Sequence, residues 1–250
     1  METQTILNKN TSTNVTERIS GSEAIVRCLI EEEVKIIYGY PGGAIMPVYD
    51  ELYKYQDKIH HVLTRHEQGA THSAQGFARI SGKVGVAIAT SGPGATNLIT
   101  GIADAQIDST PMVCITGQVP SHLLGSDAFQ ETDIIGISTP VTKWNCQVTK
   151  ASQIPGAIAK AFYIAKSGRP GPVLVDITKD AQFEEFDFSY EKCTKVRSYM
   201  PVPKTAQSSL EAAAKIINEA KKPLIVWGKG VILSEAEQQF KDFVEKAGIP

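Results

Sequence analysis

Short apolar stretches alternate with amphipathic helical patterns along the chain from Ser20 to about Ile177. Parallel strands need a crossover connection, which is usually a helix, so this alternation predicts an α/β fold with a parallel sheet covered by helices on both faces. The predicted strands are 35–38, 60–64, 84–89, 112–116, 141–148 and 172–177, and the predicted helices are one capped by Ser20 and those at 44–53, 67–82, 94–106 and 152–167.

The alternation stops after Asp180. Residues 181–205 carry charges, aromatics and two prolines, which is typical of a linker. A second α/β domain is predicted to start at 206–250, with a helix at 207–220, a strand at 223–227 and a helix at 234–247. One strand and two helices cannot bury a sheet, so we expect this domain to be truncated. The sequence thus predicts a disordered tail over 1–19, a first domain over 20–180, a linker over 181–205 and a partial second domain over 206–250.

Composition excludes several classes of function. A formal net charge of -2 offers no overall attraction for nucleic acid or an anionic membrane. No apolar run reaches the ~18 residues that a membrane span requires. The first twenty residues lack the apolar core of a signal peptide, and although an organellar transit peptide stays open, a cytoplasmic protein is predicted. The four cysteines are widely spaced, which suggests neither a zinc site nor a disulfide framework.

One stretch, Thr64 to Ala70, stands where a predicted strand passes into a helix. Ligands of α/β folds bind at the carboxyl ends of the strands, so Glu67 is the leading candidate for a catalytic carboxylate. A carboxylate in the first turn of a helix is also stabilised by the helix dipole and needs no function. The choice between these interpretations depends on the surroundings of Glu67.

A second loop, Ser91 to Asn97, resembles a phosphate-binding turn between strand and helix. It departs from the dinucleotide pattern at Asn97, and the strand at 112–116 leads to Gly117 rather than to an acidic residue that would hold a ribose. A nicotinamide cofactor is therefore disfavoured, and a simple tight turn stays open. The long loop after Gly117 offers Phe129 and Gln130 as ligand contacts, whereas the spacing of the histidines matches no metal signature.

Six motifs carry a resemblance to a known family. They are Tyr40-Pro-Gly-Gly-Ala44, Arg65-His-Glu-Gln-Gly-Ala70, Thr90-Ser-Gly-Pro-Gly-Ala-Thr-Asn97, Thr116-Gly-Gln-Val-Pro120, Asp127-Ala-Phe-Gln-Glu131 and Ser167-Gly-Arg-Pro-Gly-Pro-Val-Leu-Val-Asp176. Together they resemble the large catalytic subunits of the acetolactate synthases, a family of thiamine-diphosphate-dependent enzymes. The likeness to this family, rather than to related decarboxylases and oxidases, depends mainly on the loop from Gly117 to Glu131.

The resemblance implies that residues 20–180 are the pyrimidine-binding domain. In the family, the glutamate that matches Glu67 hydrogen-bonds the N1' atom of the cofactor's aminopyrimidine and promotes loss of the proton from thiazolium C2. Burial in an apolar interface would raise the pKa of such a carboxyl group and suit it to share a proton with the ring. Pyruvate is then decarboxylated and joined to a second 2-oxoacid, giving 2-acetolactate, or 2-aceto-2-hydroxybutyrate from 2-oxobutyrate, for the synthesis of branched-chain amino acids.

Other functional residues are implied by the same resemblance. Gln130 matches a residue near the reacting centre and joins Glu67 as a catalytic candidate. The remaining matches are Pro41, Pro93 and Asn97 in the pyrimidine pocket, Ser109 and Arg169 as contacts to FAD, and Gly43, Phe129, Lys143 and Lys179 along the substrate channel.

The resemblance also implies cofactors and partners. FAD would be bound without a redox role. The family's Mg²⁺ and diphosphate ligands lie in a third domain that these 250 residues lack, and the cofactor bridges two subunits. We therefore expect a homodimer or higher homo-oligomer, a possible small regulatory subunit, and no activity from the 250-residue chain alone. Glu33 departs from the family by replacing a glycine, and Ser73 by replacing an alanine.

Three hypotheses follow from the sequence. The first is part of an acetolactate synthase, the second is another decarboxylase or carboligase of the same cofactor class, and the third is a non-catalytic domain that binds a nucleotide or a partner.

Overall fold

The computed structural model describes residues 17–250, so residues 1–16 of the tail predicted over 1–19 lie outside the described part. The chain divides into two compact units between Pro201 and Val202. The limits of the four predicted segments themselves stay a prediction.

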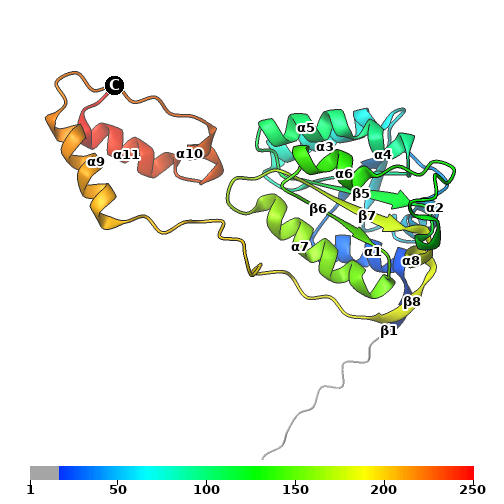
Figure 1. The fold of residues 1–250 in the computed structure, drawn as a ribbon. Helices are drawn as coiled ribbons and strands as arrows, with labels where there is room; N and C mark the ends of the chain where they lie inside the picture. Colours follow the sequence, from blue (N-terminus) through cyan, green and yellow to red (C-terminus); the bar gives the residue numbers. More distant parts are fainter. Residues whose placement is uncertain (1–16) are drawn as a thin grey trace, which may run out of the picture. The chain divides into compact units, whose positions relative to one another are not determined.

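The first unit is built on a six-stranded parallel sheet with the order β3-β2-β4-β5-β7-β6. Figure 1 labels β5, β7 and β6 of this sheet. The sheet confirms the predicted α/β fold, and each of the six strands was expected from the sequence within a few residues. The strands are β2 (Ile36–Gly39), β3 (His60–Leu63), β4 (Gly85–Ala89), β5 (Met112–Gln118), β6 (Trp144–Val148) and β7 (Pro172–Thr178).

Helices cover both faces of the sheet (Figure 1). Helices α1, α2 and α7 bury one face and helices α3, α5 and α6 the other. The central strand β5 serves both layers, because Val113 packs on the first side and Cys114 on the second, as the two-residue period of a strand requires. The helices are α1 (Gly21–Glu31), α2 (Met46–Lys54), α3 (Glu67–Ser81), α4 (Pro93–Asn97), α5 (Ile99–Ile107), α6 (Ile134–Ser138), α7 (Ile154–Lys166) and α8 (Lys179–Phe183), with 3-10 turns at Ser121–Leu123, Thr139–Val141 and Ala151–Gln153.

The ends of α1 show how local sequence sets the elements. Ser20 caps the helix as predicted, because its Oγ accepts a hydrogen bond from the backbone N–H of Glu23 at 3.2 Å. At the other end, the N–H of Val34 donates to the carbonyl of Leu29 and that of Glu33 to the carbonyl of Ile30. This is a Schellman motif with Glu33 at its left-handed position, φ 62°, where glycine is preferred.

Three sequence predictions need correction in this unit. A short antiparallel pair, β1 (Glu17–Ser20) with β8 (Glu185–Phe188), lies within stretches predicted to be tail and linker. The predicted helix 94–106 is divided at Leu98, whose N–H bonds to Ala95 three residues back and so tightens the turn. Strand β6 starts three residues later than predicted because Thr139–Val141 forms a 3-10 turn.

The second unit contains α9 (Gln207–Glu219), α10 (Lys229–Leu233) and α11 (Glu237–Ala247). The strand predicted at 223–227 is wrong: the segment has no strand partner among the described residues, and only Ile225 donates a backbone hydrogen bond, to Pro250 at 3.0 Å. The rings of Trp227 and Phe240 are tilted against each other, with their centroids 5.6 Å apart. Within 202–250 only Ile249 is buried, so the apolar side chains of this unit are largely exposed.

Candidate functional site at the carboxyl edge of the sheet

The loops that follow β2, β3, β4 and β5 gather at the carboxyl edge of the sheet, where ligands of open α/β sheets bind. Glu67 is the first residue of α3, directly after the turn from β3. The preceding residue, His66, caps the helix through Nδ1, which accepts from the N–H of Gln68 at 3.1 Å. Because the cap fixes the first turn, the backbone of Glu67 is held at the strand-to-helix junction predicted from the sequence.

Glu67 is 7% exposed, and one of its carboxylate oxygens is held by a neighbour. Asn97, at the end of α4, donates from Nδ2 to Oε2 of Glu67 at 2.9 Å. The other oxygen, Oε1, takes part in no hydrogen bond within residues 17–250 and lies 3.2 Å from the place where a Cβ on Gly94 would stand. The arrangement therefore orients the carboxylate through one oxygen and leaves the second able to exchange a hydrogen bond with a ligand.

Tyr49 is a neighbour of this site that sequence reasoning missed. Its ring meets that of His61 edge to face at 5.0 Å, and its hydroxyl lies 3.3 Å from Nε2 of His61. Burial, and next the charge of Glu67, raise the pKa of Tyr49, so the phenol stays protonated at neutral pH. Burial also lowers the pKa of His61. No sequence pattern pointed to Tyr49, which lies on α2 and meets Glu67 only through the fold.

The loop after β2 is tied to the loop after β4. The N–H of Ala44 donates to Oγ1 of the buried Thr90 at 3.1 Å, and the carbonyl of Ala44 accepts from Nε2 of Gln182 at 2.8 Å. These bonds fix the Pro41–Gly43 turn in relation to the Pro93 turn. Two of the predicted pocket residues are thus held on the loops that flank Glu67.

The loop before α6 crosses the Gly92 turn. Gly92 has φ 55°, and a Cβ on it would lie 2.5 Å from the carbonyl oxygen of Gln130. Gln130 itself has a positive φ of 58°, and Phe129 beside it is 88% exposed. Glu131 closes this loop by accepting from the N–H groups of Gly125 and Ala128, which lower the pKa of its carboxyl group. The structure therefore brings the backbone of Gln130 against the turn that leads to Asn97.

A buried carboxylate supports this loop from the sheet. Asp176 in β7 accepts from Thr116 Oγ1 at 2.7 Å, Gln147 Nε2 at 3.0 Å and Gln118 Nε2 at 3.1 Å. Gln118 also donates to the carbonyl of Thr132 at 3.0 Å, two residues after Gln130. Burial without a cation raises the pKa of Asp176 to about 6. Asp176 ended one of the six quoted motifs, but its role as a loop anchor was not predicted.

Three predicted residues lie at the opposite, amino edge, roughly 20 Å away along a seven-residue strand. Arg169 donates from Nε to Ser109 Oγ at 2.8 Å and from Nη2 to the carbonyl of Ile107 at 3.1 Å. Lys143 donates to the carbonyls of Ile164 and Ser167. Ser109 and Arg169 are brought together, but neither they nor Lys143 join the Glu67 cluster, whereas Lys179 follows β7 at the carboxyl edge.

Within residues 17–250 no group of three or more His, Cys, Asp or Glu side chains could hold a metal ion. No helix of that part of the chain has both the length and the apolar composition for crossing a membrane.

Comparison with known families decides the class of this site. The family described as "Thiamine pyrophosphate enzyme, N-terminal TPP binding domain" matches residues 19–137, which contain Glu67, Asn97 and Gln130. The central domain of the same enzymes matches residues 210–250. The chain belongs to the thiamine pyrophosphate enzymes. Its six-stranded parallel sheet flanked by helices agrees with the pyrimidine-binding domain expected from the motifs.

Among the thiamine pyrophosphate enzymes, this chain is similar to acetolactate synthases. The chain is 56% identical over 234 residues to the acetolactate synthase large subunit of Corynebacterium glutamicum, covering 94% of this chain and 37% of that protein. It is 51% identical to the acetolactate synthase of Mycobacterium leprae, with the same coverage, and 48% identical over 236 residues to the large subunit of Haemophilus influenzae, of which it covers 41%. The chain thus spans about two fifths of the length of these relatives.

Proposed function

We propose that this chain binds the aminopyrimidine half of thiamine diphosphate in an acetolactate synthase and that Glu67 is its proton-handling carboxylate. The observation that carries the proposal is the pairing of Glu67 with Asn97, which orients one carboxylate oxygen and leaves Oε1 without a protein partner among residues 17–250. A heterocycle that offers a ring nitrogen and an amino group fits such a site, because a carboxyl oxygen can donate to or accept from it. When bound, thiamine diphosphate supplies the carbanion chemistry for decarboxylation.

Each residue of the site has a proposed role. Glu67 exchanges a proton with the ring, and Asn97 holds its carboxylate in place so that the transfer needs no reorientation. Pro41 and Pro93 present apolar surface on the two flanking turns. Gln130 lies near the reacting carbons, and Phe129, Gly43 and Lys179 line the approach of pyruvate or 2-oxobutyrate. Lys143 lies at the opposite edge of the sheet and is given no role in this approach.

The proposal includes two cofactors beyond thiamine diphosphate. Mg²⁺ would bind to ligands outside these 250 residues, in the third domain that the resemblance implies. Arg169 and Ser109 would contact FAD, since a guanidinium group suits a phosphate. Both assignments depend on the resemblance of the motifs.

A homodimer or larger homo-oligomer is proposed because apolar side chains are exposed around the site. Phe129 is 88% exposed, Leu63 58% and Tyr40 40%, which is typical of a surface that another subunit covers. The large-subunit names of the relatives suggest a small regulatory subunit as a further partner. Four free cysteines suit a reducing cytoplasm.

The proposal is tested in a chimera in which residues 17–250 replace the matching segment of the Corynebacterium glutamicum relative. We expect it to form acetolactate from pyruvate with thiamine diphosphate, Mg²⁺ and FAD. Glu67→Gln should lower kcat by roughly 10²–10⁴-fold, the usual contribution of general acid–base catalysis. Glu31→Gln, an exposed change on α1, is the matched control and should leave kcat unchanged.

Two results would count against this function. A folded chimera that forms no acetolactate would exclude it, as would a Glu67→Gln chimera with the parental rate.

Product analysis separates the synthase from another carboligase of the same cofactor class. The 250-residue chain alone should show no turnover at an enzymatic rate, and such turnover would contradict the expected need for further domains.

A further inference from the structure

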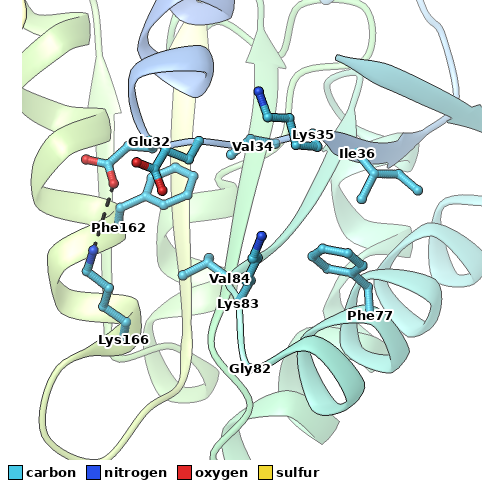
Figure 2. A pocket seen from close by; sticks show the side chains of 11 residues that line it. Glu32, Val34, Lys35, Ile36, Phe77, Gly82, Lys83, Val84, Phe162 and Lys166 are labelled. Carbon is cyan, nitrogen blue, oxygen red and sulfur yellow. Dashed lines mark ion pairs between the residues drawn. The ribbon is translucent and has the colours of Figure 1, made fainter. Parts of the chain in front are cut away.

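The charged side chains around the hollow at the amino edge of the sheet either point apart or pair with each other. The hollow has a volume of about 250 Å³ (Figure 2). Figure 2 shows Lys35 pointing away from Lys83, and Glu32 pairs with Lys166 at 4.0 Å. Buried polar side chains converge instead inside the sheet, around Asp176 of β7.

Gln118, the last residue of β5, uses its whole amide in hydrogen bonds. It is 1% exposed, and its Oε1 accepts from the N–H of Val119 at 2.9 Å. Its Nε2 donates to Oδ2 of Asp176 at 3.1 Å and to the carbonyl of Thr132 at 3.0 Å. Because an amide has one oxygen and two N–H donors, turning it over would point its oxygen at two acceptors. Val119 and Asp176 thus fix the orientation in which the amide can reach Thr132.

Asp176 orients Gln118 as a hydrogen-bond acceptor. Its Oδ2 accepts from Gln118 and from Nε2 of Gln147 at 3.0 Å, and its Oδ1 accepts from Oγ1 of Thr116 at 2.7 Å. An asparagine in this place could present its oxygen to both glutamines and its NH₂ group to the threonine hydroxyl, which can also accept. The arrangement therefore requires an acceptor rather than a negative charge.

Residues 125–132 form a closed loop that ends at the carbonyl held by Gln118. The carboxylate of Glu131 accepts from the N–H groups of Gly125 and Ala128, and the N–H of Glu131 donates to the carbonyl of Ala128 at 2.9 Å. Since these bonds join the closed loop into one unit, holding its end holds the whole loop.

The closed loop lies against the turn that leads to Asn97. A Cβ on Gly92 would be 2.5 Å from the carbonyl oxygen of Gln130, so the two backbones approach closely. Gly92 caps α4, and its carbonyl accepts from the N–H of Thr96 at 2.9 Å. Asn97 ends α4 and donates to Oε2 of Glu67 at 2.9 Å. Displacement of the closed loop would therefore loosen the turn that aims Asn97 at Glu67.

We propose that Gln118 is a positioning residue for Glu67. Oriented by Asp176, it holds the closed loop against Gly92, and this contact keeps α4 and Asn97 beside the carboxylate. The inference rests on the proposed role of Glu67 and extends it to two buried residues that act through other groups. Such positioning matters for rate, because a displacement of about 1 Å can lower a rate by about 10²-fold.

Hydrogen exchange in the 250-residue chain, measured by mass spectrometry, tests the link to the closed loop. Asp176→Leu removes the acceptor for Gln118, so the closed loop and α4 should exchange about tenfold faster relative to α1. Asp176→Asn should restore the protection of the parent. Val175→Ala is the matched control, because Val175 is the neighbouring buried residue of β7 and packs in the opposite layer. It should speed exchange no more in the closed loop than in α1.

Gln118→Met is a second variant, which keeps the length of the side chain, removes its amide and should speed exchange in the same two segments. It replaces Asp176→Leu if circular dichroism shows that the leucine variant does not fold. In the chimera with the Corynebacterium glutamicum relative, Gln118→Met should lower kcat roughly 10- to 100-fold. Combined with Asn97→Ala, it should lower kcat by less than the product of the two single factors, because both changes act on one carboxylate.

Three results would overturn the inference. They are equal acceleration of exchange in the closed loop, α4 and α1, an Asp176→Asn chain that exchanges like Asp176→Leu, and multiplied effects of Gln118→Met and Asn97→Ala on kcat. A parental chimera that forms no acetolactate would instead refute the proposed function, and hydrogen exchange would still decide whether Gln118 holds the closed loop.

Discussion

The two edges of one sheet are held in different ways. At the carboxyl edge the connecting loops approach each other through backbone atoms, as where the carbonyl of Gln130 lies against Gly92 and the N–H of Ala44 is bound by Thr90. At the amino edge the connections are joined by long side chains, as where Arg169 reaches Ser109 and Lys143 reaches the end of α7. From these contacts we predict that the carboxyl rim is more rigid than the amino rim.

This difference indicates why the proposed chemistry belongs at the carboxyl edge. A proton transfer requires reacting atoms held to within a fraction of an ångström, which buried backbone contacts provide. Side-chain bonds at a solvated surface are individually weak and can rearrange around a ligand. Substitutions at the two edges can therefore be compared by the free energy of unfolding that each one costs.

The largest effect is expected from Gly92→Ala. Its Cβ would lie 2.5 Å from the carbonyl oxygen of Gln130 at a positive φ, so backbone strain and overpacking add. We expect a loss of about 3 kcal/mol or more in the free energy of unfolding. Gly82→Ala, at φ 70° at the end of α3 with nothing within 4 Å of its Cβ, should cost only about 1 kcal/mol.

Urea denaturation followed by circular dichroism measures both changes. If Gly92→Ala and Gly82→Ala lower the free energy of unfolding equally, the backbone at Gln130 moves to accommodate the new Cβ. The carboxyl rim would then be no more rigid than the amino rim.

A smaller effect concerns pH and Asp176. Its pKa rises from an ordinary 3.8 to about 6 in the folded chain, so between these values the folded state holds more protons than the unfolded state. The free energy of unfolding therefore falls as pH rises from about 4 to about 6, by roughly 2–3 kcal/mol at 1.36 kcal/mol per pKa unit. Asp176→Asn should remove most of this fall.

The measurement is a series of urea titrations between pH 4 and 7. Asp108→Asn removes an exposed carboxylate at the amino edge, where Asp108 pairs with Arg79, and controls for the loss of any one carboxylate. If the parent and Asp176→Asn show the same dependence on pH, the Asp176 network carries no buried charge of consequence.

The sequence predicted the parts of this molecule that local pattern controls. Strands β4, β5 and β7 are continuous apolar runs that are buried on both faces, and helix α1 carries a regular apolar face. The sequence therefore predicted these strands and this helix correctly. The β1–β8 pair was missed because its partners are four residues long and separated by most of the unit. The run at 223–227 has strand composition, but a strand needs a hydrogen-bonded neighbour, and none is formed within the described residues.

Some members of the candidate site were named from the sequence, but their contacts were not. Glu67 and Asn97 were both named from motifs, yet the hydrogen bond between them joins residues thirty positions apart and depends on how α3 and α4 pack. Tyr49 and Asp176 act through burial, which follows from tertiary packing rather than from their local sequence. Three predicted residues lie at the amino edge because each precedes a strand instead of following one: Ser109, Arg169 and Lys143.

The smallest expected effect compares one hydrogen bond from each edge. Thr90→Val leaves the N–H of Ala44 buried without its acceptor, which should cost about 1–3 kcal/mol of stability. Ser109→Ala removes the acceptor of an exposed guanidinium that water can solvate instead, so its cost should stay below about 1 kcal/mol. Urea denaturation of both variants measures the two losses in stability. If Ser109→Ala costs as much stability as Thr90→Val, both rims are held with equal strength.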